Sequence, residues 1–147
     1  MIATLNAAMC STGEISNTIH CKDEGPRQCS MELVEYIARQ YDHPKIAMFG
    51  LQPAMAEALS AVFLLRIFDL DQQNEGKVFN NSAVETGKYS LQKLEEWCDL
   101  FLVTGSTIVN GTIDHFLERE KPVIFYGTTI VGPARLLGLK HFCPRAT

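Results

Sequence analysis

Four short apolar runs, separated by segments with helical periodicity, constrain the fold of this chain more than any other feature. The runs occupy residues 45–50, 64–69, 100–104 and 122–126. Their continuous rather than alternating hydrophobicity is typical of strands buried on both faces of a parallel sheet. The connections between them are long enough for right-handed crossover helices. The pattern predicts one α/β domain over residues 1–147, with three Rossmann-like layers around a mostly parallel sheet of about four to five strands.

The segments between the runs carry further signals. Ser90 is a suitable N-cap for a helix that begins at Leu91. Residues 130–137 predict a short helix, and residues 141–143 predict an edge strand. Residues 72–89 are polar and contain two turn-forming stretches, Asn-Glu-Gly and Asn-Asn-Ser, so we predict a loop there.

The first 44 residues predict a helical extension packed on this domain. Ser30, followed by Leu33, Ile37 and Tyr41 at helical spacing, indicates a capped amphipathic helix. A second short helix is expected over residues 3–9. The polar residues between the two helices predict a loop.

The charge balance and the cysteine content exclude several classes of protein. The net charge is −4 and the basic residues are scattered, so neither nucleic acid nor anionic lipid is an expected partner. No apolar run approaches the ~20 residues that span a bilayer, and no basic residue precedes Lys22 as it would in a signal peptide. Five cysteines, an odd number without regular spacing, favour a reducing compartment. We therefore expect a cytoplasmic protein.

Three of the predicted strands end in or beside glycine, at Gly50, Gly105 and Gly127. The carboxyl ends of parallel strands meet at one edge of a sheet, and glycine there allows a ligand to approach the backbone closely. Helix N-termini at this edge would point free N–H groups into the crevice and favour an anionic or carbonyl-bearing ligand. Polar side chains follow the same strand ends: Ser106, Thr107, Asn110, Thr112, Thr128 and Thr129. Each of these residues could equally serve only a turn or a helix cap, and the sequence leaves both roles open.

A dinucleotide site is disfavoured by the turn after the first strand. Asp69 and Asp71 lie about 20 residues past Gly50, where an acid that binds a ribose would be expected. However, the turn is Gly50-Leu51-Gln52-Pro53 and lacks the G-x-G-x-x-G that lets the backbone approach a pyrophosphate. We therefore do not expect NAD, and the two acids could simply be solvated strand ends.

The spacing of cysteine and histidine does not predict a thiolate metal site. The candidate ligands are His20, Cys21, Cys29, His43, His141 and Cys143. No C-x-x-C or H-x-x-x-H pair is present, whereas structural zinc sites usually have such pairs.

Catalytic residues are not identifiable from the sequence. No serine–histidine–acid order and no G-x-S-x-G elbow is present. Asp114 and His115 are adjacent, so on a helix they would point about 100° apart rather than pair. If the protein is an enzyme, Asp69 or Asp114 is the expected acid–base group.

The stretch Leu102-Val-Thr-Gly-Ser-Thr-Ile-Val-Asn-Gly-Thr-Ile-Asp114 is the most specific in the chain. It resembles the signature of the DUF364 family, also named the putative heavy-metal chelation domain. Other blocks match in the same order: residues 3–7, the strand and turn at 47–50 with Pro53, the acid after the second strand, and residues 126–129.

This resemblance implies a Rossmann-like C-terminal domain. In longer members it follows an enolase-N-terminal-like domain, with a ligand cleft between the two. By position, the family motif implies roles for Asn6, Thr104, Gly105, Ser106, Thr107, Asn110, Gly111 and Thr112.

Two departures from the family pattern concern possible partners. The chain starts at the Ala-Thr-Leu-Asn-Ala block, so we expect the preceding domain to be absent, and its fourth strand ends in Gly-Thr-Thr where Gly-Pro-Ser is expected. The missing wall of the cleft would then come from a second copy in a homodimer or from a separate companion domain. Exposed apolar side chains at Leu33, Ile37 and Tyr41 are the expected contact surface.

The leading hypothesis is a module that binds a small ligand, with a heavy metal or a metal–chelate complex implied by the resemblance. The candidate ligand-binding residues are Asn6, Gly50, Gln52, Asp69, Thr104, Gly105, Ser106, Thr107, Asn110, Gly111, Thr112, Gly127, Thr128 and Thr129. The alternatives are an enzyme acting on a small polar metabolite or chelator, and a domain that docks on another protein. Asn110 can donate and accept hydrogen bonds, so it either contacts the ligand or braces its own loop.

Overall fold

The computed structural model describes residues 1–18 and 22–146. In this part of the chain, seven strands form one sheet in the order β3-β4-β2-β1-β5-β6-β7. The strands are β1 (Ile46–Phe49), β2 (Leu65–Phe68), β3 (Val78–Phe79), β4 (Ser82–Glu85), β5 (Leu100–Thr104), β6 (Val123–Tyr126) and β7 (His141–Phe142). All neighbouring pairs are parallel apart from β3 and β4. The predicted Rossmann-like α/β fold is confirmed.

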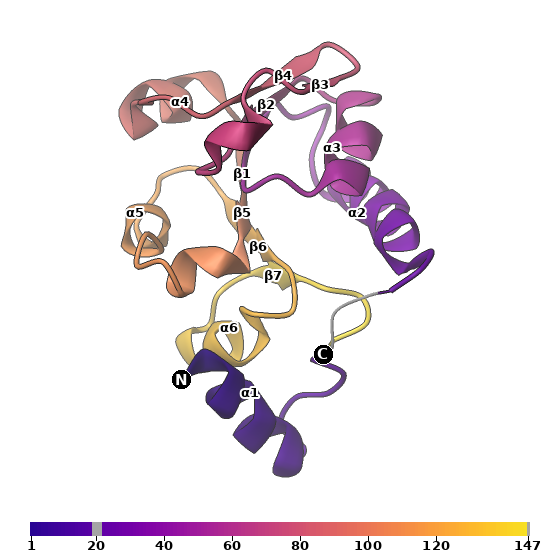
Figure 1. Cartoon of the computed structure of the whole chain (residues 1–147), viewed down its shortest axis with the longest axis vertical. Coiled ribbons are helices and arrows are strands. Elements are labelled where there is room, and N and C mark those ends of the chain that lie inside the picture. The colour runs from indigo at the N-terminus through magenta and orange to yellow at the C-terminus, as the bar shows by residue number, and fades with distance from the viewer. Residues whose placement is uncertain (19–21, 147) are drawn as a thin grey trace.

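Helices cover both faces of this sheet (Figure 1). They are α1 (Ile2–Ser11), α2 (Gly25–Gln40), α3 (Pro53–Ser60), α4 (Leu91–Trp97), α5 (Asp114–Leu117) and α6 (Val131–Leu137), with 3-10 turns η1 (Gln72–Asn74) and η2 (Gly105–Ile108). Helices α2 and α3 pack on one face, and α4, α5 and α6 pack on the other. Helix α1 packs on α6. No described helix is long and apolar enough to cross a membrane.

The four predicted strands are adjacent and parallel, as expected. β1 lies between β2 and β5, and β6 pairs with β5. All four residues of β1 are buried, which explains its unbroken hydrophobicity. Successive side chains alternate between faces, so Ile46 and Met48 join the core under α2 and α3, while Ala47 and Phe49 face α4 and α5.

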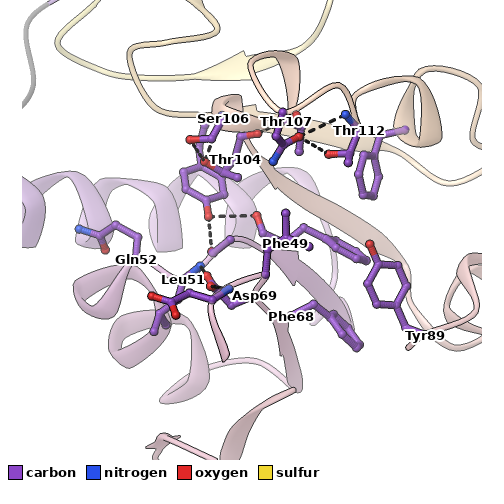
Figure 2. A pocket seen from close by; sticks show the side chains of 16 residues that line it. Phe49, Leu51, Gln52, Phe68, Asp69, Tyr89, Thr104, Ser106, Thr107 and Thr112 are labelled. Atoms are coloured by element: carbon purple, nitrogen blue, oxygen red, sulfur yellow. Dashed lines mark hydrogen bonds between the residues drawn. The ribbon is translucent and has the colours of Figure 1, made fainter. Parts of the chain in front are cut away.

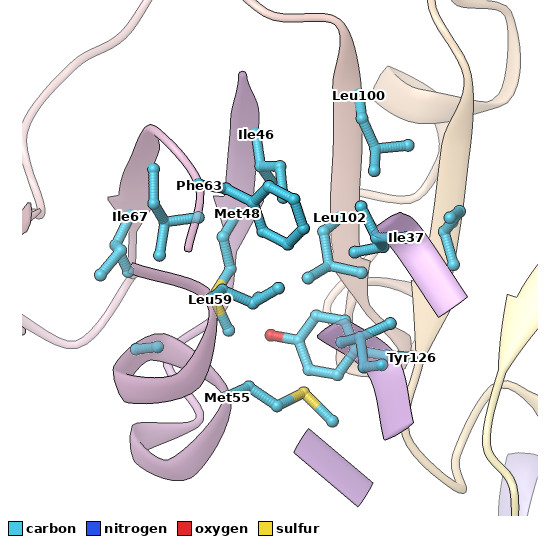
Figure 3. Packing of buried hydrophobic residues seen from close by; sticks show 14 of the residues in the cluster. Ile37, Ile46, Met48, Met55, Leu59, Phe63, Ile67, Leu100, Leu102 and Tyr126 are labelled. Carbon is cyan, nitrogen blue, oxygen red and sulfur yellow. The ribbon is translucent and has the colours of Figure 1, made fainter. Parts of the chain in front are cut away.

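The first of these cores also buries the N-terminal residues that we expected on the surface. Leu33 and Ile37 of α2 are 0% exposed and pack with Leu59 and Met48, and Figure 3 shows Ile37 beside Tyr126 and Leu102. The prediction of an exposed apolar patch at Leu33 and Ile37 is therefore wrong, because this face of α2 is the one that covers the sheet. The homodimer itself stays a prediction.

The segment predicted as a loop, residues 72–89, contains a hairpin. β3 and β4 pair antiparallel, and β4 pairs in parallel with β2, so the sheet is larger than the predicted four to five strands. Asn80 adopts a positive φ of 50° in the two-residue turn, a conformation that asparagine tolerates better than most residues. Val84 is 1% exposed and anchors the hairpin in the core. The apolar residues on both sides of the Asn-Asn turn were the available signal.

Helix α2 begins six residues earlier than predicted, at Gly25 rather than at Met31, the residue after Ser30. Pro26 occupies the first turn, where proline is well tolerated. Ser30 lies inside the helix and donates its hydroxyl to the carbonyl of Pro26 at 2.6 Å, a common arrangement for serine within helices. The predicted cap at Ser90 is confirmed, since its side chain accepts a hydrogen bond from the Lys93 amide.

Candidate functional site

A cavity of about 400 Å³ lies at the carboxyl ends of β1, β2, β5 and β6. Most of the predicted site residues line it: Gly50, Gln52, Asp69, Thr104, Ser106, Thr107, Asn110 and Thr112. Figure 2 shows Thr104, Ser106, Thr107 and Thr112 along one side, with Gln52, Leu51, Asp69 and Phe68 along the other. The convergence of strand ends predicted from the sequence thus places these side chains around one space.

Asp69, at the end of β2, organises the turn after β1. Its Oδ2 accepts a hydrogen bond from the Leu51 amide at 2.6 Å, and its Oδ1 accepts from the Asp71 amide at 2.8 Å and from Asn74 Nδ2 at 3.2 Å. A carboxylate that accepts several N–H bonds is well suited to fixing two loops at once. The Leu51 N–H therefore points at Asp69 rather than into an open crevice.

Two further amides near the strand ends, those of Met55 and Ser106, are also bonded to side chains of the protein itself. Gln52 Oε1 accepts from the Met55 amide at 2.6 Å, and Thr104 Oγ1 accepts from the Ser106 amide at 3.4 Å. We had expected these helix N-termini to offer free N–H groups to a ligand, and for these three amides that expectation is wrong. Side chains placed as caps satisfy them, as they do at most helix starts.

Gly50 and Tyr126, which both line the cavity, hold the ends of β1 and β6 together. The Tyr126 hydroxyl donates to the Phe49 carbonyl at 3.2 Å and to the Gly50 carbonyl. Gly50 has a φ of +92°, and a Cβ on it would lie 2.5 Å from Thr104 Cγ2. Burial raises the pKa of the Tyr126 hydroxyl well above its usual value, so it remains a neutral donor.

The motif that follows β5 is braced by its own hydroxyl and amide groups. Thr107 is 4% exposed and donates to the Thr104 carbonyl at 2.8 Å. Asn110 Oδ1 accepts from the Thr112 amide at 3.2 Å and from the Thr112 hydroxyl at 2.6 Å. One side of the Asn110 amide thus braces the loop, while its Nδ2 has no hydrogen-bond partner among the described residues and remains available to a ligand.

An aromatic group, which the sequence did not single out, forms the apolar wall of the cavity. The Phe49 ring lies 5.0 Å from Phe68, 5.1 Å from Tyr89 and 4.7 Å from Phe116, measured between ring centroids. Phe49 and Phe68 are 4% and 3% exposed, whereas Tyr89 is 37% exposed. Phe49 and Phe68 are the last residues of β1 and β2, and their place at the strand ends was the available signal.

Asn6, Thr128 and Thr129 lie outside this cavity, around a separate hollow between α1 and the turn before α6. Asn6 Nδ2 donates to the carbonyls of Thr128 and Thr129, and Asn6 Oδ1 accepts from the Gly132 amide at 3.0 Å. The amide of Asn6 therefore fastens α1 to the start of α6. These hydrogen bonds give Asn6 a structural role that requires no ligand.

The remaining predicted glycines do not line the cavity either. A Cβ on Gly105 would lie 2.8 Å from Ile130 Cβ, so the motif turn needs glycine for close packing against the β6–α6 turn. Gly111 follows Asn110 in the loop but does not line the cavity. Gly127 lines a smaller cavity of about 160 Å³, which Cys29 and Cys143 also line.

The described residues contain no group of three or more His, Cys, Asp or Glu side chains suited to a metal ion. His20 and Cys21 lie outside the described residues, so any part they play stays a prediction. Burial raises the pKa of the Cys98 thiol to about 11, as expected of an inert core cysteine. Asp114 and His115 are exposed and lie outside the 400 Å³ cavity.

Comparison with known proteins identifies the family. The model of the family DUF364, "Putative heavy-metal chelation", matches residues 32–137. The chain belongs to the DUF364 family. The matched range contains β1 to β6 and most of α2, and therefore every residue that lines the candidate cavity.

The fold is similar to that of a solved structure of the family. A DUF364 protein of unknown function from Pyrococcus horikoshii matches with a TM-score of 0.55 and 22% identity, over 92% of this chain and 50% of that one. A DUF364 protein of unknown function from Desulfitobacterium hafniense matches with a TM-score of 0.46 and 19% identity, over 71% of this chain and 41% of that one. The chain thus spans about half the length of the Pyrococcus protein. No curated protein matches it.

Proposed function

We propose that this DUF364 domain binds a small ligand in the 400 Å³ cavity, and that the ligand is a metal ion held in an organic chelator. The observation that carries the proposal is the cavity itself, which is lined by aromatic rings and by hydroxyl and amide groups. Its volume lies in the range of about 300–1,000 Å³ that is typical of small-molecule sites. Metal chelation, as the family's description names it, supplies the class of ligand.

A chelated metal fits the lining better than a bare ion does. The cavity offers two carboxylates, Asp69 and Asp71, and Asp69 already accepts three hydrogen bonds. Bare metal ions generally need several protein ligands at short distances. A ligand that brings its own donor atoms needs from the protein only a shaped space and a few polar contacts.

Binding is the proposal rather than catalysis, because the candidate acid–base groups are poorly placed. Asp69 is engaged by Leu51, Asp71 and Asn74, and Asp114 lies outside the cavity. A general acid or base needs to reach the reacting atom with a free oxygen.

The test is an NMR titration with zinc alone and with the zinc complex of bipyridine. Amide signals of residues 104–112 should shift with the complex. A phenylalanine at Ser106, an exposed residue that lines the cavity, should block the space and abolish these shifts. Ser11→Phe is the matched control, because Ser11 is exposed on α1 and lies outside the cavity.

Equal shifts in Ser106→Phe and in Ser11→Phe would contradict the proposal, as would shifts confined to residues far from the cavity. Zinc alone should give much weaker shifts at residues 104–112. If zinc alone bound there as well as its complex does, the chelator would play no part and that half of the proposal would fail.

A further inference from the structure

Two backbone donors that could hold an anion at the β1–α3 turn are not open in this cavity. Phosphates and carboxylates bind to free N–H groups at strand-to-helix turns. Here the Leu51 amide is bonded to the Asp69 carboxylate at 2.6 Å, and the Met55 amide is bonded to Gln52. The protein's own carboxylate thus occupies the position that an anionic ligand would take at the β1–α3 turn.

The charges around the cavity also disfavour an anion. Its charged lining residues are Asp69 and Asp71, and none of the described residues that line it is Lys, Arg or His. Arg66 lies behind the wall, with its guanidinium carbon 5.1 Å from the Phe68 ring centroid, but its charge is paired with Glu85 at 2.7 Å. The local charge is therefore negative, and the whole chain carries a net charge of −4 as well.

The cavity that these carboxylates line also has an aromatic wall. Tyr89 packs against Phe49 and Phe68 at centroid distances of 5.1 and 5.2 Å, and it is the ring of this group with the largest exposure, 37%. Figure 2 places Tyr89 and Phe68 together on one side of the strand end that carries Phe49. Aromatic faces attract cations and stack on flat apolar ligands.

We infer that the cavity selects a flat organic ligand by charge, taking cations best, neutral molecules next and anions of the same shape worst. The inference rests on the proposed function, since it concerns the ligand of that cavity. A metal complex with a positive net charge and an aromatic chelator belongs to the preferred class. Asp71 is the residue that distinguishes the charge of the ligand. The Asp69 carboxylate is engaged in three hydrogen bonds, whereas the Asp71 carboxylate accepts, among the described residues, only from the Gln73 amide.

Three indole compounds test the inference without any metal: tryptamine is a cation, tryptophol is neutral and indole-3-acetate is an anion. Affinities come from NMR titration of the full chain at low ionic strength. Tryptamine should bind about tenfold tighter than indole-3-acetate, because reversing a charge beside two carboxylates in a wet site has an effect of that order. Tryptophol should lie between them.

Two variants assign the effect to a residue. Asp71→Asn should weaken tryptamine binding by about two- to fivefold and leave tryptophol unchanged, as expected for a partly solvated ion pair. Asp114→Asn removes the same charge from an exposed position outside the cavity and should change neither affinity.

The possible outcomes separate this inference from the proposed function. If all three compounds bind at the cavity with equal affinity, or if indole-3-acetate binds best, the charge selection is wrong while the binding site stands. If Asp114→Asn weakens the binding of tryptamine as much as Asp71→Asn does, Asp71 is not the residue that distinguishes the charge of the ligand. If none of the three shifts a cavity residue at millimolar concentration, the inference about flat organic ligands fails, and the titration with the zinc–bipyridine complex decides the proposed function separately.

Discussion

Replacing Asp69 by asparagine tests whether this carboxylate, rather than a ligand, holds the strand-end turns in place. Asparagine has a single acceptor oxygen, so it can keep either the bond from the Leu51 amide or the bonds from Asp71 and Asn74, but not both sets. The amide group of the new side chain would then face another N–H donor. At least one charge-assisted hydrogen bond is lost, which costs about 1.5–3 kcal/mol of unfolding free energy.

A loss of this size should lower the Tm by roughly 5–10 °C in a chain of this length. Asp71→Asn is the matched control. In the described part of the chain, Asp71 Oδ1 accepts only from the Gln73 amide, at 2.9 Å, and asparagine can preserve that bond. We expect the control to lose no more than about 0.5 kcal/mol. Calorimetry or denaturant melts of the unliganded proteins provide the comparison.

The Asp69→Ala variant tests whether the Leu51 amide can bind an anion once the carboxylate is removed. Removing the carboxylate frees the Leu51 N–H, so sulfate should raise the Tm of Asp69→Ala more than that of the wild type at matched ionic strength. The reasoning is refuted if Asp69→Asn and Asp71→Asn melt alike, or if sulfate stabilises both proteins equally.

Three further substitutions test the surroundings of the cavity. Gly50→Ala combines a positive φ with a collision against Thr104 and should lower the unfolding free energy by about 2–4 kcal/mol. Gly76→Ala is the control, with a φ of +72° and no atom within 4 Å of the added Cβ, and should cost only about 1 kcal/mol. Similar melting temperatures for the two variants would refute the close approach of Gly50 to Thr104. The wild type should lose stability as the pH rises above about 10, because the pKa of Tyr126 is raised in the folded protein and the neutral hydroxyl is favoured there. Tyr126→Phe should flatten this part of the plot of stability against pH. An unchanged plot in the variant would contradict the role of the buried hydroxyl. Asn110→Ala should lower the unfolding free energy of the unliganded protein by less than about 1 kcal/mol, because the hydrogen bonds of Asn110 within its loop are exposed. The same variant should weaken the binding of the zinc–bipyridine complex. A large drop in Tm would show instead that Asn110 is a structural brace.

The sheet could be predicted from the sequence because its central strands are buried on both faces. An unbroken apolar run such as residues 46–49 is typical of a strand buried on both faces, and the glycine after it marks where the strand ends. The hairpin of β3 and β4 was missed because β3 is only two residues long and Val78 is 63% exposed. A short edge strand carries too little hydrophobic periodicity to be distinguished from a loop.

The position of the candidate site could also be predicted, but its chemistry could not. Strand ends converge in any parallel sheet, so Asp69 and Thr104 were expected near each other. An amide at that edge can face either a ligand or a side chain of the protein. Which of the two it faces depends on residues that are far away in the sequence. The Leu51 amide is 18 positions from the Asp69 carboxylate that accepts it, and Asn6 is 126 positions from the Gly132 amide that it accepts. Because of such a contact, the Leu51 amide, which we expected to be free for an anionic ligand, is bonded to the Asp69 carboxylate.

The most direct test of the proposed function is a crystal structure with the zinc–bipyridine complex, in which anomalous scattering locates the metal. The proposal predicts one strong zinc peak inside the cavity, with the bipyridine rings against Tyr89 and the metal nearer to Asp71. Ser106→Phe crystals soaked in the same way should lack this peak. A zinc peak only at exposed side chains such as His43 or His115, with an empty cavity in the wild type, would contradict the account.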